Sequence, residues 1–488
     1  MTTPATAEAR PNYSPRYKNL VLTLLVVAYT LNFVDRTIIA TIGQAIKVDL
    51  KISDTQLGLL GGLYFALLYT LLGIPIARIA ERASRVNIIA WAILVWSGFT
   101  ALCGMAASFA QLALYRFGVG IGEAGLSPPA HSLISDYFEP RKRASALSVY
   151  SFGIPLGIMF GAVVGGWLAQ NFSWRVAFMA VGVPGILVAL VIKLLIQEPP
   201  RGHSETPLPA SADTQAARAP STLGNELKEV GAVTRILLGR WPVLHMVVGI
   251  TLANIGSYGS GQFVPPYFIR TFGLNYTQVG VITGLVSGFS AGIGTLLGGF
   301  AADRLARRGA RWYALTPAIG LSIAAPLYIA AYLQDSWQTA ALILLLPGIF
   351  HYTYLGPTFG VVQNAVATHQ RATAAALLLF FLNLIGLGGG PPLTGWMIDH
   401  FAAFNYAHPD TGGLLAALGG FFSADTQSFQ LACPGGAAPP DAAAAVAARC
   451  ANSLALATRQ GIIVTLCFYF WAALHYLVSS FGLAKQRV

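Results

Sequence analysis

The chain has 488 residues, of which 55% are hydrophobic and only 10% charged, and its mean hydropathy is +0.61. These values exceed what a water-soluble core needs, and they exclude an ordinary soluble domain. The net charge of +11 would suggest a nucleic-acid partner, but most Lys and Arg residues flank apolar segments on one side, which argues against one.

Apolar segments long enough to cross a bilayer recur along the whole sequence. A spanning helix needs about 20 mostly apolar residues. About twelve segments qualify, near 19–46, 56–79, 87–109, 111–134, 144–169, 174–196, 241–269, 276–301, 312–333, 338–366, 372–399 and 460–482. The polar N-terminus shows no cleavage pattern of a signal peptide, so we expect the first segment to remain a span. The sequence predicts an all-α membrane protein.

The segments divide into two groups of six. We expect a disordered N-terminus (1–18), a six-helix bundle (19–196), a linker with a short amphipathic helix (197–239), a second bundle (240–482) and a short tail (483–488). The second bundle carries a long loop (400–459). The Lys and Arg excess places both termini in the cytoplasm and this loop outside.

Two acids and two bases interrupt the first and fourth segments: Asp35, Arg36, Arg116 and Glu123. A charge near the bilayer centre costs about 2.5–3.5 kcal/mol on insertion scales. We therefore expect these residues to lie on an ion or substrate pathway. The alternative is a static ion network that only fixes helix packing.

Helical geometry predicts how the four charges pair. Arg116 and Glu123 share one helix face but lie about 10.5 Å apart along the axis, so each needs a partner on another helix. We expect Asp35 near Arg116, and Arg36 near Glu123 or open to a cavity. Protonation of one acid would leave net positive charge, which attracts an anionic headgroup; Asp35 and Glu123 are thus the candidate proton-coupling acids, with Arg36 and Arg116 as their partners and as anion-binding groups.

The two halves repeat a motif. Glu81, Arg82 and Arg85 follow the second segment, and Asp303, Arg304 and Arg307 follow the eighth at the same offsets. The second copy resembles the cytoplasmic loop motif of the major facilitator superfamily, and Arg116-x-x-x-Gly120-x-Gly122-Glu123 resembles its fourth-helix motif. The resemblance implies two pseudo-symmetric six-helix halves, alternating access and a monomer.

Within that superfamily, Asn32-Phe33-Val34-Asp35-Arg36 together with Arg116 and Glu123-Ala124-Gly125 is similar to the Spinster family. That family is associated with lysophospholipid or sphingosine-1-phosphate movement. The first-segment element also resembles organic anion:cation symporters. The Gly157-x-x-x-Gly161 pattern resembles an antiporter motif but lacks its usual Pro, so it does not establish antiport.

Further polar and aromatic residues in the spans are candidates for the substrate cavity. His351 either binds substrate or relays protons, or it only bonds across helices. We expect the seventh segment to be irregular around Gly256–Gly261 and Pro265-Pro266, and to form an extracellular gate. The full set of candidate lining residues is Tyr64, Tyr69, Asn254, Ser257, Tyr258, Gln262, His351, Tyr352, Asn364 and Asn383, besides Arg36, Arg116 and Glu123.

The repeated loop motif is a candidate cytoplasmic gate. An acid can cap a helix N-terminus and the bases can pair with acids such as Asp136. The candidate latch residues are Glu81, Arg82, Arg85, Asp136, Asp303 and Arg304. The alternative is that these charges only set topology.

Four cysteines fall in two environments. Cys433 and Cys450 share the long external loop, where an oxidising compartment permits a disulfide, whereas Cys103 and Cys467 lie in spans. The letters of Gly120-x-Gly122-x-x-Gly125 match a dinucleotide fingerprint, but no strand precedes them. We expect no metal site, no bound cofactor and no enzymatic activity.

These features predict a secondary transporter driven by the proton gradient, in a bacterial inner membrane. The expected substrate is an amphipathic anionic lipid, such as a lysophospholipid or a sphingosine-1-phosphate-like molecule. One alternative is a proton-coupled symporter of a small hydrophilic organic anion, which a sealed polar pocket would favour. Another is a membrane lipid sensor that does not transport.

Overall fold

Helices are the only regular elements in the part of the chain that the structure describes. A computed structural model covers residues 12–204, 223–367, 370–411 and 413–484. The remainder of the predicted N-terminal segment, linker and tail lies outside these ranges. The first half comprises α1 (Pro15–Thr41), α2 (Gly43–Leu50), α3 (Asp54–Gly61), α4 (Leu63–Arg82), α5 (Arg85–Cys103), α6 (Phe109–Glu123), α7 (Ser127–Tyr137), α8 (Pro140–Ser151), α9 (Gly153–Asn171) and α10 (Trp174–Leu195).

The second half begins with a helix that lies across the others. This helix, α12, ends where α13 begins, and the two are bent by 94°. The second half comprises α12 (Leu223–Gly239), α13 (Trp241–Phe272), α14 (Tyr276–Ala306), α15 (Trp312–Tyr332), α16 (Trp337–His351), η1 (Tyr352–Tyr354), α17 (Leu355–Asn364), α18 (Arg371–Phe381), η3 (Leu382–Leu387), α19 (Gly388–Ala407), α20 (Leu414–Gly419), η4 (Phe421–Ser423), α21 (Thr426–Ala432), η5 (Pro434–Gly436) and α22 (Ala444–Leu483).

Ten helices or helix pairs in the described residues are long and apolar enough to cross a membrane, and α12 with α13 would make an eleventh. The predicted segment 111–134 is not among these spans. It is present as two shorter helices, α6 and α7, separated by three residues after Glu123. The predicted all-α membrane fold is therefore present.

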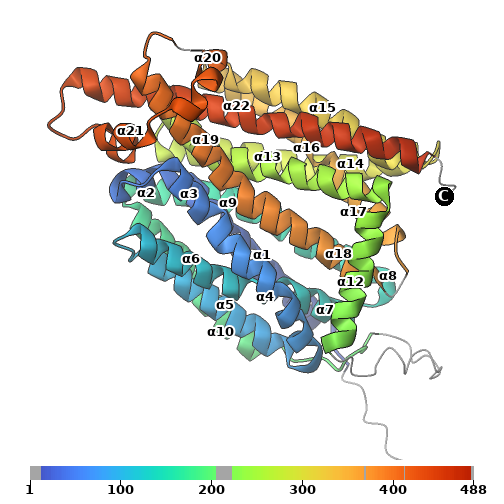
Figure 1. The fold of residues 1–488 in the computed structure, drawn as a ribbon. Coiled ribbons are helices and arrows are strands. Elements are labelled where there is room, and N and C mark those ends of the chain that lie inside the picture. The colour runs from blue at the N-terminus through green and yellow to red at the C-terminus, as the bar shows by residue number, and fades with distance from the viewer. Residues whose placement is uncertain (1–11, 205–222, 368–369, 412, 485–488) are drawn as a thin grey trace, which may run out of the picture.

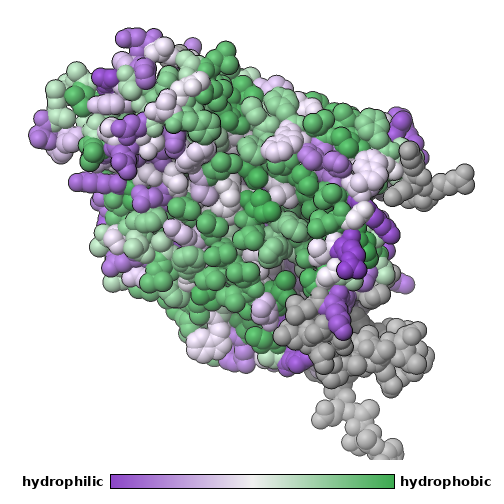
Figure 2. All heavy atoms as spheres, in the orientation of Figure 1, coloured by the Kyte–Doolittle hydropathy of each residue, from purple (hydrophilic) through white to green (hydrophobic). Residues whose placement is uncertain are grey.

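The two halves form two helix bundles packed side by side (Figure 1). We call the end where α1 begins and α22 finishes the terminal face, and the opposite end, which carries α2, α20 and α21, the loop face. In Figure 1 the loop face is at the left and α12 runs down the terminal face at the right. Figure 2 shows hydrophobic side chains over the middle of the molecule, with hydrophilic residues gathered toward the two faces.

The seventh predicted segment is regular, so the expected irregularity is wrong. Helix α13 runs unbroken from Trp241 to Phe272 through Pro265 and Pro266. Its glycines allow close packing instead of breaks: a Cβ at Gly256 would lie 2.8 Å from the Tyr469 ring, and one at Gly259 would lie 2.5 Å from Thr394 Oγ1. The small residues therefore bring α13 against α22 and α19.

A row of glycines on α14 shows how the halves separate. A Cβ built at Gly280 would lie 2.3 Å from a backbone oxygen of α9, one at Gly284 3.1 Å, and one at Gly288 3.4 Å. A Cβ at Gly292 would meet nothing within 4 Å. Successive glycines of this row lie on nearly the same side of the helix, because four residues are close to one turn. Helices α9 and α14 thus touch near the loop face and diverge toward the terminal face.

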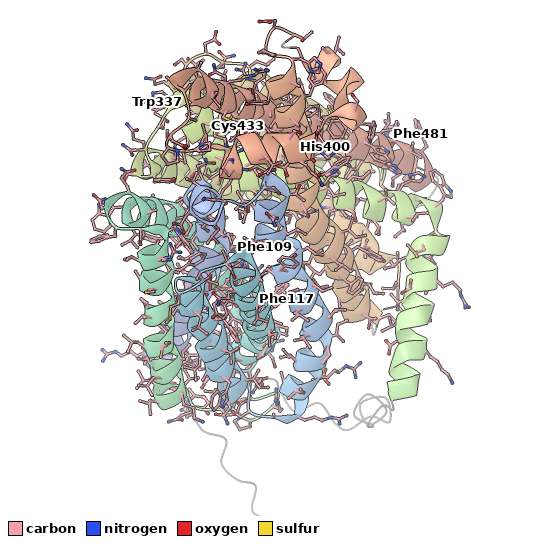
Figure 3. All side chains as sticks on the ribbon, turned by 60° about the vertical axis from the view of Figure 1, so that its left-hand side comes forward. Phe109, Phe117, Trp337, His400, Cys433 and Phe481 are labelled. Carbon is pink, nitrogen blue, oxygen red and sulfur yellow. A yellow bond between two sulfur atoms is a disulfide. The ribbon has the colours of Figure 1, made fainter. Side chains whose placement is uncertain are left out.

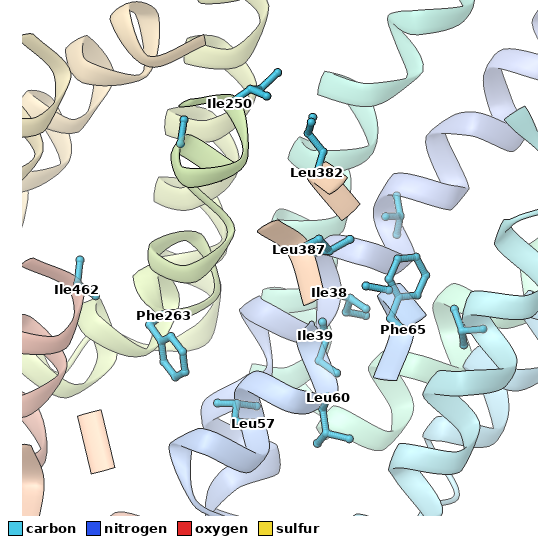
Figure 4. Packing of buried hydrophobic residues seen from close by; sticks show 14 of the residues in the cluster. Ile38, Ile39, Leu57, Leu60, Phe65, Ile250, Phe263, Leu382, Leu387 and Ile462 are labelled. Atoms are coloured by element: carbon cyan, nitrogen blue, oxygen red, sulfur yellow. The ribbon is translucent and has the colours of Figure 1, made fainter. Parts of the chain in front are cut away.

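The contact of α3 and α4 with η3 and α19 is also close near the loop face and open toward the terminal face. A Cβ at Gly58 of α3 would lie 2.3 Å from the Pro391 carbonyl, and one at Gly62 would lie 2.7 Å from the Leu387 carbonyl. Farther along, Gly73 of α4 has open space around it. Figure 4 shows Leu387 beside the first-half core around Phe65. The structure is closed at the loop face and splayed at the terminal face.

Candidate functional site

Two cross-helix ion pairs join α1 to α6 in the first half. Arg36 Nε lies 2.6 Å from Glu123 Oε2, and Arg116 Nη1 lies 3.8 Å from Asp35 Oδ1. These are the two pairs that helical geometry predicts. Thr100 of α5 also donates to Asp35, and Arg116 Nε donates to the Leu60 carbonyl at 3.2 Å.

Arg36 differs from its three charged neighbours in exposure. Its side chain is 19% exposed, whereas those of Glu123, Arg116 and Asp35 are 0–2% exposed. The guanidinium carbon of Arg36 lies 4.4 Å from the ring centre of Tyr69, 5.0 Å from Phe65 and 5.2 Å from Phe33. Rings at these distances attract a cation through their faces. Arg36 is therefore the member of the cluster that a ligand can reach.

Several buried polar atoms around the pairs have no hydrogen-bond partner among the described residues. These atoms are Glu123 Oε1, Asp35 Oδ1, Arg116 Nη1 and both amide atoms of Asn32. An unsatisfied buried polar group is costly, and in a native protein it calls for an explanation such as a ligand or a proton site. Asn32 is 1% exposed and was not among the predicted site residues, although it opens the motif that contains Asp35.

Glu123 occupies a break in its transmembrane path. It is the last residue of α6, and α7 starts at Ser127. The glycines before it allow close packing, because a Cβ at Gly120 would lie 2.5 Å from the Phe65 carbonyl and one at Gly122 would lie 2.5 Å from the Trp96 nitrogen. This packing holds the end of α6 against α4 and α5, and so fixes Glu123 beside Arg36.

At the corresponding place in its own fourth path, the second half has a 3-10 turn, η1, which joins α16 to α17. His351 ends α16 and is 2% exposed. Its Nδ1 lies 3.4 Å from the Tyr328 hydroxyl and its Nε2 3.4 Å from the Tyr469 hydroxyl. Its ring stacks on Tyr352 with centroids 4.4 Å apart. An aromatic cluster thus occupies the position that the ion pairs occupy in the first half.

The predicted cavity residues separate into several environments. Tyr69 lies on Arg36, and Tyr352 lies on His351. Tyr258 is 39% exposed, and Ser257 and Asn383 are partly buried. Tyr64 packs on Phe109 and Phe117, with ring centres 6.0 and 5.1 Å away.

Three other predicted residues do not join the charged cluster. The Asn254 amide is buried and donates to the Ile250 carbonyl of its own helix at 2.8 Å. Gln262 is buried against Gly61, at the contact between α13 and α3. Asn364 is exposed and lines a separate cavity at the terminal face.

Among the latch residues whose side chains the structure describes, no ion pair joins the two halves. Buried Arg85 pairs with Asp136, and its Nε lies 2.7 Å from Glu198 Oε1. All three belong to the first half and the segment that follows it. The side chains of Glu81, Arg82 and Arg304 are exposed, and the side chain of Asp303 lies outside the described part of the structure. The latch role remains a prediction.

A buried ion network at the loop face was missed by the sequence analysis. Asp54, at the start of α3, accepts from Arg270 of α13 at 2.7 and 3.1 Å, and Lys47 Nζ lies 3.1 Å from its Oδ2. Arg270 also donates to Gln44 and to Thr458, each at 2.8 Å. All three charged side chains are 0–3% exposed. The network therefore ties the second half to the first.

A second acid, Asp399 of α19, completes this network. Its carboxylate accepts from the backbone nitrogens of Asp54 at 2.9 Å and Thr55 at 2.8 Å, and from the Thr55 hydroxyl at 2.6 Å. A carboxylate at a helix N-terminus satisfies free N–H groups and favours the helix dipole. Asp399 thus caps α3 of the opposite half. No local pattern predicts this, since 345 residues separate the partners along the chain.

The segment between α19 and α22 folds over the loop face. Cys433 and Cys450 form a disulfide, and Cys103 and Cys467 are free. Figure 3 brings this end of the molecule forward and labels His400 and Cys433. A Cβ at Gly435 would lie 2.8 Å from the Lys47 carbonyl, so the segment packs directly on the helix that carries Lys47.

Comparison with known proteins shows that the chain is similar to membrane transporters. The family model described as Major Facilitator Superfamily matches residues 25–391. An MFS-type efflux pump of Mycolicibacterium smegmatis is 33% identical over 387 residues, 79% of this chain and 86% of that protein. The hexuronate transporter of Bacillus subtilis is 25% identical over 402 residues, 81% of this chain and 91% of that protein.

A solved structure resembles the whole fold. It is a bacterial homologue of the human lysosomal transporter Spinster, in an inward-facing and unoccupied conformation. It is 34% identical, covers 98% of this chain and 99% of its own, and superposes with a TM-score of 0.80.

Proposed function

This chain belongs to the major facilitator superfamily of membrane transporters and resembles its Spinster branch, and we propose that it moves an amphipathic anionic lipid by proton-coupled alternating access. The substrate would be a lysophospholipid or a molecule like sphingosine-1-phosphate. The observation that carries the proposal is the charged cluster, in which a buried acid, Glu123, holds a partly exposed base, Arg36, in an otherwise apolar span.

Arg36 can bind either Glu123 or the substrate, and the protonation state of Glu123 decides which. Ionised Glu123 attracts Arg36 at 2.6 Å. When Glu123 takes up a proton this attraction is lost, and the guanidinium fork becomes available to a phosphate or carboxylate. When the proton leaves, the carboxylate competes with the headgroup for Arg36. Asp35 and Arg116 form the second pair and would adjust the charge balance in the same way.

The splayed contacts between the halves suit an acyl chain. Beside Gly73 on α4, Leu71 and Ile74 are 48% and 44% exposed, and Leu285 and Phe289 on α14 are 53% and 56% exposed. We propose that these apolar side chains contact the acyl tail while the headgroup reaches Arg36. This favours a lipid over a small hydrophilic anion, which would need a sealed polar pocket.

The network at the loop face must break for the transporter to open there. Arg270 and Asp399 belong to the second half and contact Asp54 and Thr55 of the first. With the terminal face in the cytoplasm, as the Lys and Arg distribution favours, the present conformation faces inward. Proton-driven cycling would then alternate this state with one in which these contacts are lost. We place the protein in a bacterial inner membrane as a monomer.

The test is substrate flux in proteoliposomes with and without an imposed pH gradient. We expect gradient-stimulated lysophospholipid flux, reduced to the level without a gradient in Glu123→Gln and Asp35→Asn. The control is Asp49→Asn, because Asp49 pairs with Arg175 on the surface, where both side chains are over a third exposed. Unchanged flux in both cluster variants would contradict the coupling role.

The second candidate is a proton-coupled symporter of a small organic anion. The relative named a hexuronate transporter, at 25% identity, favours it. Hexuronate flux without lysophospholipid flux, in the same vesicles, would establish this alternative. Protein that moves neither substrate would favour a lipid sensor.

A further inference from the structure

A second cavity lies within the second half at the terminal face. Its volume is about 510 Å³, and α13, α14, α15, α17 and α22 surround it. Its polar wall consists of Arg240, Tyr313 and Asn364, and most of the remaining lining residues are glycine or alanine. Asn364 comes 13 residues after His351 in the sequence, which corresponds to about 20 Å along a helix. The cavity is therefore distinct from the site at the centre of the molecule.

Glycines bring the cavity up to the helix backbones. A Cβ built at Gly299 of α14 or Gly360 of α17 would meet nothing within 4 Å, so the space beside both is open. A Cβ at Gly356 would meet only the Gly299 Cα, at 3.7 Å. A larger side chain at Gly299 or Gly360 would project into this space. The wall thus lacks projecting side chains at these glycines, which leaves space for the glycerol and upper acyl part of a lipid.

Arg240 supplies a fixed positive charge in the cavity wall. It precedes α13, and its Nη1 donates to the Ala365 carbonyl at the end of α17, at 2.9 Å. This bond orients the guanidinium and leaves its other N–H groups for a ligand. Asn364 and Tyr313 add amide and hydroxyl donors. This donor set suits an oxyanion.

Three further arginines lie close in sequence to residues of the cavity wall, although none of the three lines the cavity itself. Arg304 lies in the last turn of α14, Arg307 caps that helix, and Arg311 directly precedes α15. Ala302 and Ala310, which neighbour these arginines in the sequence, line the cavity. Basic pockets between transmembrane helices on the cytoplasmic side are known recognition sites for acidic lipid headgroups.

We propose that this cavity binds the headgroup of an anionic phospholipid from the adjacent leaflet. The phosphate contacts Arg240, Asn364 and Tyr313, and the glycerol part lies along Gly299 and Gly360. A bound lipid would bridge α14 and α17 and so brace the open face of the second half. The inference does not depend on which substrate the central site moves.

Native mass spectrometry of the full-length protein in detergent tests the site. The probes are phosphatidylglycerol, phosphatidylcholine and inorganic phosphate. We expect phosphatidylglycerol to bind more tightly than phosphatidylcholine, and Arg240→Gln and Gly360→Leu each to weaken phosphatidylglycerol binding by about tenfold, since bonds to a charged group are lost or the space is filled.

Matched controls separate the site from a general surface effect. Arg141→Gln removes an exposed arginine of α8 in the first half, and Gly98→Leu fills open space beside α5; both should bind phosphatidylglycerol as wild type does. Melting temperatures establish that each variant is folded, and Tyr313→Phe gives a milder second test if Gly360→Leu is unstable. Equal binding of both lipids, or wild-type binding by folded Arg240→Gln, would overturn the proposal. So would displacement of the lipid by millimolar phosphate, which would mark a site for free anions.

Discussion

The two halves differ at the same place along their fourth path. In the first half, three residues separate α6 from α7 after Glu123, whereas in the second half α16 continues through the 3-10 turn η1 into α17. Two ion pairs are buried beside the interruption in the first half, and a histidine lies among tyrosines at the turn in the second. We therefore expect charge exchange in the first half and shape recognition in the second.

The charges of the second half lie at its edge, not at its centre. Arg270 and Asp399 reach across to α3 at the loop face. They therefore hold the halves together, whereas Arg36 and Glu123 lie within one half. Four substitutions test this division of roles, taken from the largest expected effect to the smallest.

Arg36→Gln should weaken substrate binding most. A bond to a charged group contributes about 1.5–3 kcal/mol, so we expect the apparent substrate affinity to fall on the order of 10- to 100-fold. Concentration-dependent flux in proteoliposomes measures this. Arg175→Gln, which removes an exposed surface arginine, is the control. An unchanged affinity in Arg36→Gln would show that the charged cluster of the first half does not bind the anionic substrate.

Asp399→Asn should shift the conformational equilibrium. The neutral amide has a single acceptor oxygen for the N–H groups of α3, and the lost bonds exist only while the loop face is closed. We expect the state that is open at the loop face to gain roughly tenfold in population. Distances between spin labels on α2 and α21 across the loop face would report it. The surface variant Asp49→Asn should show the wild-type distances, and identical distances in Asp399→Asn would contradict the role in closure.

Tyr69→Leu should weaken substrate binding moderately. The Tyr69 ring lies 4.4 Å from the Arg36 guanidinium, and such contacts contribute about 0.5–2 kcal/mol. We expect an affinity loss of about fivefold. Tyr64→Leu on the same helix is the matched control, since Tyr64 packs on Phe109 and Phe117, away from Arg36. Equal losses in both variants would indicate that only helix packing has changed.

His351→Gln should have the smallest effect. Its two contacts to tyrosine hydroxyls are long, at 3.4 Å, so each contributes little. We expect the apparent affinity to change by about threefold or less, with the response of flux to the pH gradient intact. Loss of that response would assign proton transfer to the second half and contradict the division of roles between the halves.

Sequence patterns predicted much of the charged cluster but little of the loop face. Asp35, Arg36, Arg116 and Glu123 stood out because each interrupts an apolar run, and helical periodicity alone required partners on other helices. Lys47 and Arg270 do not interrupt an apolar run in this way, and nothing near them in the sequence marks Asp54 as their partner. Gly256–Gly261 and Pro265-Pro266 suggested an irregular helix, yet α13 is continuous because its glycines pack on α19 and α22.

The sequence by itself determined the membrane class, the two halves and the charged residues, because insertion into a bilayer depends on local composition over about 20 residues. The tertiary structure decided which distant residues meet. Asp399 finds α3 across 345 positions, and Arg240 meets the end of α17 across 125. Such contacts depend on how the helices pack and on how far the halves are splayed, and no local property of the chain encodes that arrangement.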